Sequence, residues 1–349
     1  MRWFLVLWAL CCGSGWALEA EVLHHFDAAA LEQMGLLTDV TELHLTPDGS
    51  AVLVAQEWRD GNCRVVVLDA KKGTMAGSHL IPAIEIAAFT PSASGQEAVL
   101  LLDFGRRAAR LDLRSGNVQM FYAGDTEFRF KSPVWVLDDP AVRSRFWTRG
   151  YFKDAAGQAL VAFELSSSGS VRFEPKFSLR DLLAAAEQQG PLEGLALSPD
   201  RSWGIFVTIG EEDAPARMFR FPTGELAAEA FVFAPPALFG AAGIAYLAQD
   251  RQEVHRLYLQ EKGDPLLLGE EARARFTPPV ASPSGDRILS SRLRQDRTQE
   301  FLVVREDRRL EPLAVPGWTT TKPAFYKLAR DGRTFFLATG DELLVGRLP

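Results

Sequence analysis

Three glutamates offer the residue type best suited to chemistry in this chain of 349 residues. Glu42, Glu85 and Glu193 each stand where a predicted inner strand begins, shortly before a recurring turn motif. If those strands converge, the carboxylates would form one acidic channel mouth that suits a cation, a basic peptide or the carboxylate pair of a glycoside hydrolase. The alternative interpretation is that they are solvated side chains at strand starts in an acidic protein.

The other reactive residue types lack the spacing that catalysis or metal binding needs. The five histidines form no His-x-x-x-His pair, and no Cys-x-x-Cys, Gly-x-Ser-x-Gly elbow or glycine-rich phosphate loop occurs. Cys63 opens an apolar run, so we interpret it as a buried strand residue and not as a nucleophile. The sequence therefore predicts no catalytic residue, no cofactor and no metal site.

A turn motif recurs between apolar runs and predicts the elements that would position the glutamates. Pro presets φ for a tight turn, while Asp and Gly supply a side-chain cap and a residue with positive φ. The strong copies are Thr46-Pro47-Asp48-Gly49 and Ser198-Pro199-Asp200, and the looser ones are Thr90-Pro91-Ser92, Ser282-Pro283-Ser284-Gly285 and Ala329-Arg330-Asp331-Gly332.

Each motif is followed by apolar strands and polar hairpins, so that one unit holds four short strands. Two further units keep this order without the motif. The aligned positions are Thr46, Thr90, Asp138, Ser198, Gly240, Ser282 and Ala329. They lie about 42 to 48 residues apart, with one gap of about 60, which is the period of propeller blades. We assign the longer gap to a helix inserted at 178–190, and we predict another short helix from Asp27 to Gly35.

Two stretches, 46–54 and 198–206, resemble the WD-like repeat of TolB-type β-propellers. The same repeat builds the propeller domain of prolyl-oligopeptidase-like enzymes, whose hydrolase domain has no counterpart here. The resemblance implies an all-β propeller, and the seven aligned units predict seven four-stranded antiparallel blades, with six or eight as alternatives. Because the last unit has three strands, we expect Glu21 to Phe26 to pair with Glu342 to Arg347 and close the ring.

The first 17 residues have the features of a signal peptide. Arg2 precedes an apolar run at 3–10, and Gly15 and Ala17 are the small residues that a signal peptidase reads. We expect cleavage after Ala17, a single propeller domain at 18–349, and export to the periplasm or the medium. A lipid anchor on Cys11 or Cys12 is less favoured because neither follows a lipobox. No later run is apolar and long enough to span a bilayer.

Charge and motif content leave two classes of function. A net charge of −7 argues against a nucleic acid or an anionic membrane as partner. The first class is an exported, non-catalytic, monomeric platform that binds a protein or a cell-envelope component on one face or at the channel mouth. The alternative is a propeller hydrolase that acts on a sugar or a lactone through channel carboxylates, which would need two of them at catalytic spacing in a deep pocket.

Overall fold

The protein is described here from a computed structural model. The described residues are 18–36, 40–92, 94–103, 107–122, 128–130, 137–138, 145–152, 159–166, 171–178, 192–197, 203–208, 215–220, 223, 225–231, 237–239, 243–249, 254–261, 265–272, 274–281, 287–318 and 324–349. Residues 1–17, the predicted signal peptide, lie outside them, and so do residues 179–190 of the predicted inserted helix.

The strands group into antiparallel sheets that follow the chain order, as the repeating units predict. The first sheet holds β3 (Val40–Leu45), β4 (Ala51–Glu57), β5 (Cys63–Asp69) and β6 (Thr74–Ile81). The second holds β7 (Ile86–Pro91), β8 (Glu97–Leu102), β9 (Arg107–Asp112) and β10 (Val118–Tyr122). The third holds β11 (Phe128–Phe130), β12 (Leu137–Asp138), β13 (Arg145–Phe152), β14 (Ala159–Leu165) and β15 (Val171–Ser178).

The remaining sheets have the same construction. One holds β16 (Leu192–Leu197), β17 (Trp203–Thr208), β18 (Pro215–Arg220) and β19 (Leu226–Phe231). The next holds β20 (Ala237–Phe239), β21 (Gly243–Gln249), β22 (His255–Gln260) and β23 (Leu266–Glu271). Another holds β24 (Ala274–Phe276), β25 (Val280–Ala281), β26 (Ile288–Arg294), β27 (Gln299–Val304), β28 (Leu310–Ala314) and β1 (Leu18–Glu19). The last holds β29 (Phe325–Leu328), β30 (Thr334–Ala338), β31 (Leu343–Arg347) and β2 (Glu21–Phe26).

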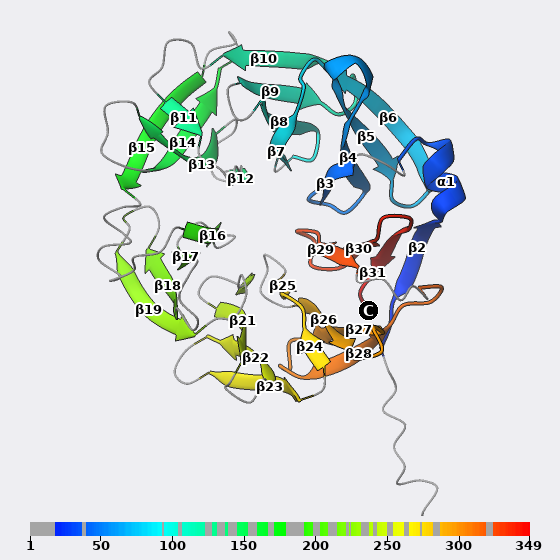
Figure 1. Ribbon diagram of the computed structural model, residues 1–349, viewed down its shortest axis with the longest axis vertical. Helices are drawn as coiled ribbons and strands as arrows, with labels where there is room; N and C mark the ends of the chain where they lie inside the picture. The colour runs from blue at the N-terminus through cyan, green and yellow to red at the C-terminus, as the bar shows by residue number, and fades with distance from the viewer. Residues whose placement is uncertain are drawn as a thin grey trace, which may run out of the picture.

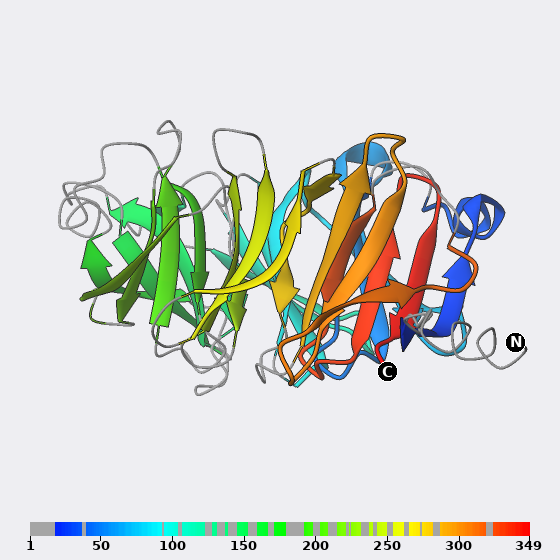
Figure 2. The ribbon, with the colours of Figure 1, turned by 90° about the horizontal axis from the view of Figure 1, so that it is seen from below.

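The sheets are arranged around a common centre. Figure 1 shows β3, β7 and β29 on the inner side and β6, β10 and β2 on the outer side. Figure 2 shows the strands running up and down between two faces. Because neighbouring strands are antiparallel, the starts of β3, β7 and β29 lie on the same face as the β4–β5 hairpin and helix α1 (Ala28–Gln33). We call this the α1 face.

The turn motif is built as its residue types predict. The Thr46 hydroxyl donates to Asp48 Oδ1 at 2.7 Å, and the Gly49 N–H donates to the Thr46 carbonyl at 2.8 Å. Gly49 has a φ of +66°, and a Cβ there would lie 2.4 Å from Thr334 of the last sheet. Glycine is therefore needed both for the left-handed backbone and for the close approach of the two sheets.

One motif alignment is wrong by two residues. In the first sheet, the N–H of Thr46 closes the turn between β3 and β4. The equivalent bond in the second sheet is made by the Ser92 N–H to the Glu97 carbonyl, with Gly95 in place of Gly49. Thr90 was the predicted counterpart because it precedes a proline, but β7 continues past it to Pro91.

The N-terminal strand lies where the missing strand of the last unit was expected. β2 pairs antiparallel with β31 in a register that joins Glu21 to Arg347 and Phe26 to Leu343. No pairing was predicted for the residues before it, and there β1 pairs in parallel with β28 of the neighbouring sheet. The N-terminal segment therefore contacts two sheets through backbone hydrogen bonds.

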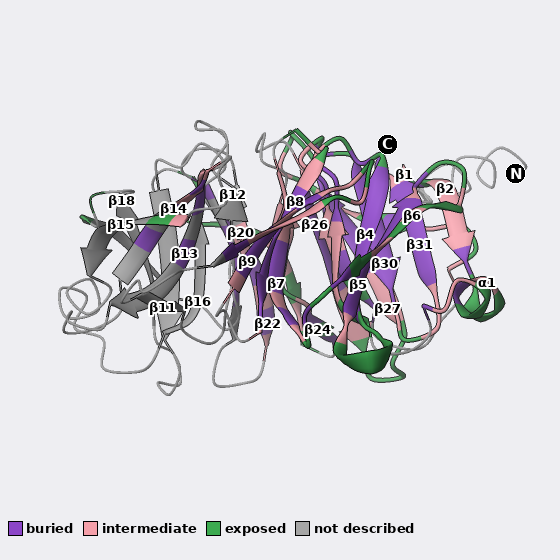
Figure 3. Cartoon of the chain, turned by 90° about the horizontal axis from the view of Figure 1, so that it is seen from above, coloured by how far each residue is buried: buried purple, intermediate pink, exposed green. Residues whose placement is uncertain are grey.

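Helix α1 follows β2 directly; its N-cap is Asp27, as predicted, and its C-cap is Met34, one residue before the predicted Gly35. Asp27 accepts a hydrogen bond from the Ala30 N–H at 2.8 Å, which satisfies one of the free donors at the helix start. Gly35 follows the last turn with a φ of +66°. Leu31 is buried against the core, whereas most of the helix surface is exposed (green in Figure 3).

Apolar side chains fill the spaces between neighbouring sheets. Leu53 and Val65 of the first sheet pack with Phe89 and Leu100 of the second, and Cys63 is buried among them. Figure 3 shows the buried centres of β4, β5, β30 and β31 in purple. Burial raises the pKa of the Cys63 thiol to about 11, which agrees with its predicted structural role. Among the described residues, no helix is long and apolar enough to cross a membrane.

Candidate binding site on the α1 face

Glu42 is held by a side chain of the first sheet and by backbone of the second. A bulge at the start of β3, between Val40 and Glu42, breaks the strand register and turns the Glu42 side chain toward the second sheet. Its Oε1 lies 2.6 Å from His44 Nε2, and its Oε2 accepts the Phe89 N–H of β7 at 3.1 Å. Glu42 therefore joins the innermost strands of the first two sheets.

Lys327 completes this cluster from the last sheet. Its Nζ donates to the Leu43 carbonyl at 2.8 Å and lies 3.3 Å from His44 Nε2. Sequence reasoning missed Lys327, since 283 positions separate it from His44. The signal that could have found it is the repeat itself, because Lys327 precedes Ala329 by two residues as His44 precedes Thr46.

The pKa shifts of the cluster describe a charged Glu42 and a charged Lys327 beside a neutral imidazole. Burial lowers the pKa of Lys327 to about 8, opposed in part by the charge of Glu42. Burial, together with the nearby Lys327 charge, also lowers the pKa of His44. For Glu42 burial alone would raise the pKa, but hydrogen bonds and charges from His44, Lys327 and Phe89 lower it below its usual value. His44 Nε2 then carries the proton that Glu42 accepts. The hydrogen bonds of the cluster thus join the inner strands of three sheets.

The three predicted carboxylates are not brought together in the described contacts. The hydrogen bond made by Ser92 aligns Ala88, and not Glu85, with Glu42. No interaction of the described residues joins Glu42 to Glu85; the Glu85 carbonyl accepts from the Asp103 N–H at 3.1 Å instead. Glu193 lies at a bulge in β16, and its side chain falls outside the description. A shared acidic mouth stays a prediction.

An apolar pocket opens beside the cluster on the α1 face. It has a volume of about 420 Å³ and lies between α1, β3, β29 and the hairpin that joins β30 to β31. Its apolar walls include Leu31, Leu36, Val40, Leu43, Phe325 and Leu343. Phe325 is 52% exposed at the rim although its neighbours in the wall are core residues. The pocket therefore offers apolar surface that this chain leaves open to solvent.

Glu342 is the charged residue among the described pocket-lining residues. The hairpin that carries it is fixed, because the Glu342 N–H donates to Thr339 Oγ1 at 3.1 Å. Its Oε2 lies 3.6 Å from His25 Nε2, and both atoms are buried without a hydrogen bond from the described residues. The Glu342 carboxylate at the pocket is thus turned toward His25.

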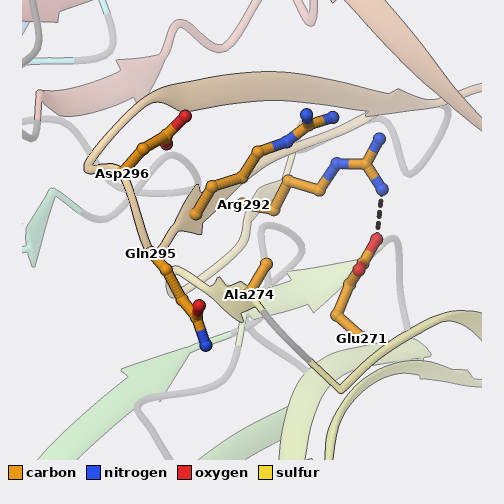
Figure 4. A pocket seen from close by; sticks show the side chains of 6 residues that line it. Glu271, Ala274, Arg292, Gln295 and Asp296 are labelled. Carbon is orange, nitrogen blue, oxygen red and sulfur yellow. Dashed lines mark hydrogen bonds and ion pairs between the residues drawn. The ribbon is translucent and has the colours of Figure 1, made fainter.

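A second pocket, of about 390 Å³, is lined by charged side chains from β23, β26 and the β26–β27 turn. Figure 4 shows Arg292 and Glu271 paired across it, with Gln295 and Asp296 on the other side. Arg292 Nε also donates to Glu300 at 2.5 Å, and Asp296 Oδ1 accepts the Thr298 N–H at 2.9 Å. Both carboxylates that line this pocket are therefore engaged within the chain, unlike the acid–base pair that a glycoside hydrolase needs.

Comparison with known proteins identifies the fold and no family. No protein-family model matches the sequence, and no curated protein matches it. Among solved structures, the Myceliophteria thermophila Cps50 (Swd1) β-propeller domain has a TM-score of 0.59 at 11% identity, covering 95% of this chain and 100% of that one.

Two further solved structures give the same fold. The RRP9 WD40 repeats superpose with a TM-score of 0.51 at 14% identity over 89% of this chain and 94% of theirs. U3-55K superposes with a TM-score of 0.51 at 13% identity over 89% of this chain and 95% of its own. The chain has a β-propeller fold. Sequence identities this low support a shared fold and nothing more, so the resemblance to TolB-type propellers stays a prediction.

Proposed function

We propose that this chain is a non-catalytic β-propeller platform that binds a protein partner on its α1 face. The observation that carries the proposal is the apolar pocket at the meeting of the first and last sheets, with Phe325 half exposed at its rim. Large apolar side chains anchored in such pockets supply most of the binding energy in protein interfaces. The WD40-like fold supports the proposal as an analogy, since such propellers are open scaffolds and function resides in grafted sites.

We further propose that the platform is a single domain of seven blades closed by β2, and that it is exported as a monomer. The grouping of the described strands into sheets and the pairing of β2 with β31 support the first part. The apolar run after Arg2 and the small residues before Leu18 support export to the periplasm or the medium. N-terminal sequencing of the protein from culture tests the expected cleavage after Ala17, and an uncleaved terminus would contradict it.

Site-specific photo-crosslinking followed by a binding measurement tests the platform proposal. A benzophenone side chain replaces Phe325 in one variant and Leu266 in the matched control, which is 48% exposed on the outer strand β23. We expect one protein to crosslink at position 325 and not at 266. The captured protein, purified, should bind the wild type and lose at least about tenfold in affinity for Phe325→Asp but not for Leu266→Asp. Equal losses, or none, would contradict the proposal.

A further inference from the structure

The contact between the inner strands of the first and last sheets depends on one ammonium group. β3 and β29 are neighbours at the centre of the molecule (Figure 1). Lys327 on β29 donates from Nζ to the Leu43 carbonyl of β3 at 2.8 Å, and the same Nζ lies 3.3 Å from His44 Nε2. Within the described residues, the hydrogen bonds that link these two strands all involve Lys327 Nζ. We call this contact the β3–β29 link.

The link holds one carboxylate and one ammonium, with an imidazole beside both. His44 Nε2 lies 2.6 Å from Glu42 Oε1 as well as 3.3 Å from Lys327 Nζ. While His44 is neutral, the charges of Glu42 and Lys327 balance. A protonated His44 would place two cations 3.3 Å apart against a single carboxylate, where burial limits the screening of charges by water. The link therefore accommodates one positive charge at low cost, and not two.

The other described neighbours of His44 cannot offset a second cation. The Phe89 ring of β7 packs edge-on against the imidazole, with the ring centroids 4.4 Å apart, and Leu53 of β4 stands opposite His44 in the sheet register. The described charges that act on His44 are those of Glu42 and Lys327. Burial and the Lys327 charge lower the pKa of His44 below its ordinary 6.5, although Glu42 opposes the shift. Its side chain is nevertheless 20% exposed, so protons from solvent can reach it.

We infer that the β3–β29 link is an acid-sensitive contact, which opens when His44 takes up a proton. Nε2 already carries the proton that Glu42 accepts, so the second proton binds Nδ1 and makes the imidazole a cation. The imidazolium stays with Glu42 and repels Lys327 from the Leu43 carbonyl, so that β29 separates from β3. The link needs no bound partner, and its response to acid is therefore independent of the proposed function.

The sign of the effect follows from the two states of His44. Because the folded chain disfavours protonated His44, the unfolded chain binds more protons just below pH 6.5, the ordinary pKa of histidine. The stability that the link confers is thus present above that pH and is lost as the pH falls below it. At pH 5.5 Glu42 is still ionised, because its pKa lies below its ordinary 4.5, and Lys327, with a pKa of about 8, is charged.

Amide hydrogen exchange at about pH 7 and about pH 5.5, read by mass spectrometry and corrected for the intrinsic rate at each pH, tests the link. For the wild type we expect the protection of residues 40–45 and 325–328 to fall about three- to tenfold at the lower pH. Protection of residues 107–122, in the second sheet, should change less than about twofold.

Three variants assign the effect to its groups. His44→Gln offers Glu42 an amide donor that does not titrate, and Lys327→Met removes the second cation, so both should lose the acid response. His79→Gln is the matched control, because His79 Nε2 lies 3.1 Å from the Leu113 carbonyl of the second sheet with no ammonium recorded beside it among the described contacts. It should respond to acid as the wild type does. The ratio between the two pH values within each protein is the measure, so a variant that is less stable at pH 7 still gives a result.

Several results would overturn the inference. An unchanged protection of residues 40–45 and 325–328 in the wild type would show that acid does not open the link. An equal acid response in the wild type, His44→Gln and Lys327→Met would show that neither group is responsible. A fall in the wild type that is as large at residues 107–122 would mark a general weakening of the fold. A failure to find a partner at Phe325 would leave all these measurements unchanged.

Discussion

The apolar pocket and the charged pocket have nearly the same volume, about 420 and 390 Å³. They differ in how far the chain itself pairs or covers the groups that line them. In the charged pocket Arg292 pairs with Glu271 and Glu300, and Arg294 also pairs with Glu300, so these charges are balanced within the chain. In the apolar pocket Phe325 is half exposed at the rim, and Glu342 is turned toward His25. Exposed apolar surface, and not the volume of a hollow, therefore marks the place where a partner is expected.

Deleting residues 18–26 should have the largest effect on stability. The deletion removes β2, which packs against the wall of the apolar pocket and not against the charged pocket. Phe26 is fully buried with Leu31 and Leu36, and β2 covers the outer edge of β31. The lost side-chain burial costs about 3–5 kcal/mol and each lost ladder bond about 1 kcal/mol. We expect a melting temperature lower by at least about 10 °C and more aggregation than for the full chain. An unchanged melting temperature without aggregation would show that β2 is not needed to hold this part of the fold.

Replacing Arg292, which lines the charged pocket, should lower the free energy of unfolding without changing the affinity for the partner. Arg292→Met leaves the half-buried Glu271 without its cation and Glu300 with Arg294 alone. We expect a loss of about 1–3 kcal/mol in the free energy of unfolding, measured with urea. Gln295→Ser, at the same pocket but exposed, is the control and should stay within about 0.5 kcal/mol of wild type. An equal loss in both variants would mean that the ion pairs contribute nothing specific.

Because of Lys327, the free energy of unfolding should rise with pH in the alkaline range. Its pKa falls from an ordinary value near 10.5 to about 8 in the folded chain, so below pH 8 the lysine is charged in both states and burial carries its full cost. Between pH 8 and the unfolded pKa the unfolded chain binds more protons, and stability rises with pH. We expect a gain of about 1–3 kcal/mol over this range in wild type that is missing from Lys327→Met. Urea unfolding at pH 7.5, 9 and 10 measures it, and parallel curves for the two proteins would contradict the assignment.

Among these variants, Phe325→Ser should have the smallest effect on stability, although we expect it to weaken partner binding most. Its ring is 52% exposed, so the change should stay within about 0.5 kcal/mol in urea unfolding, as for Leu266→Ser. A loss above about 2 kcal/mol would show that the ring supports the fold and does not wait for a partner.

The fold was largely predictable because its signals are local. Alternating apolar residues set β4 and β5, and Asp60-Gly61 marked the hairpin between them. The pairing of β2 followed from an unpaired edge in the last unit. By contrast, β1 has two residues and no pattern to read. The misplaced Thr90 shows that a Ser/Thr-Pro pair resembles a turn even where the strand continues through it.

The site was hardly predictable because it depends on contacts between distant parts of the chain. Glu42 was singled out correctly as an inner-strand residue, but its partner Lys327 comes from the opposite end of the sequence. Phe325 reads as an ordinary core residue, and its exposure follows from where the first and last sheets meet. Glu85 was chosen for a channel mouth through a misaligned motif, and in the structure its carbonyl accepts the Asp103 N–H while its Oε2 is buried.

Isothermal titration of the crosslinked partner, once purified, tests the difference between the two pockets most directly. The titrated proteins are the wild type, Phe325→Asp in the apolar pocket and Gln295→Asp in the charged pocket, so that one carboxylate is added at either place. We predict that affinity falls at least about tenfold for Phe325→Asp and less than about twofold for Gln295→Asp. A fall confined to Gln295→Asp, or equal falls for both, would contradict the assignment of the partner to the apolar pocket.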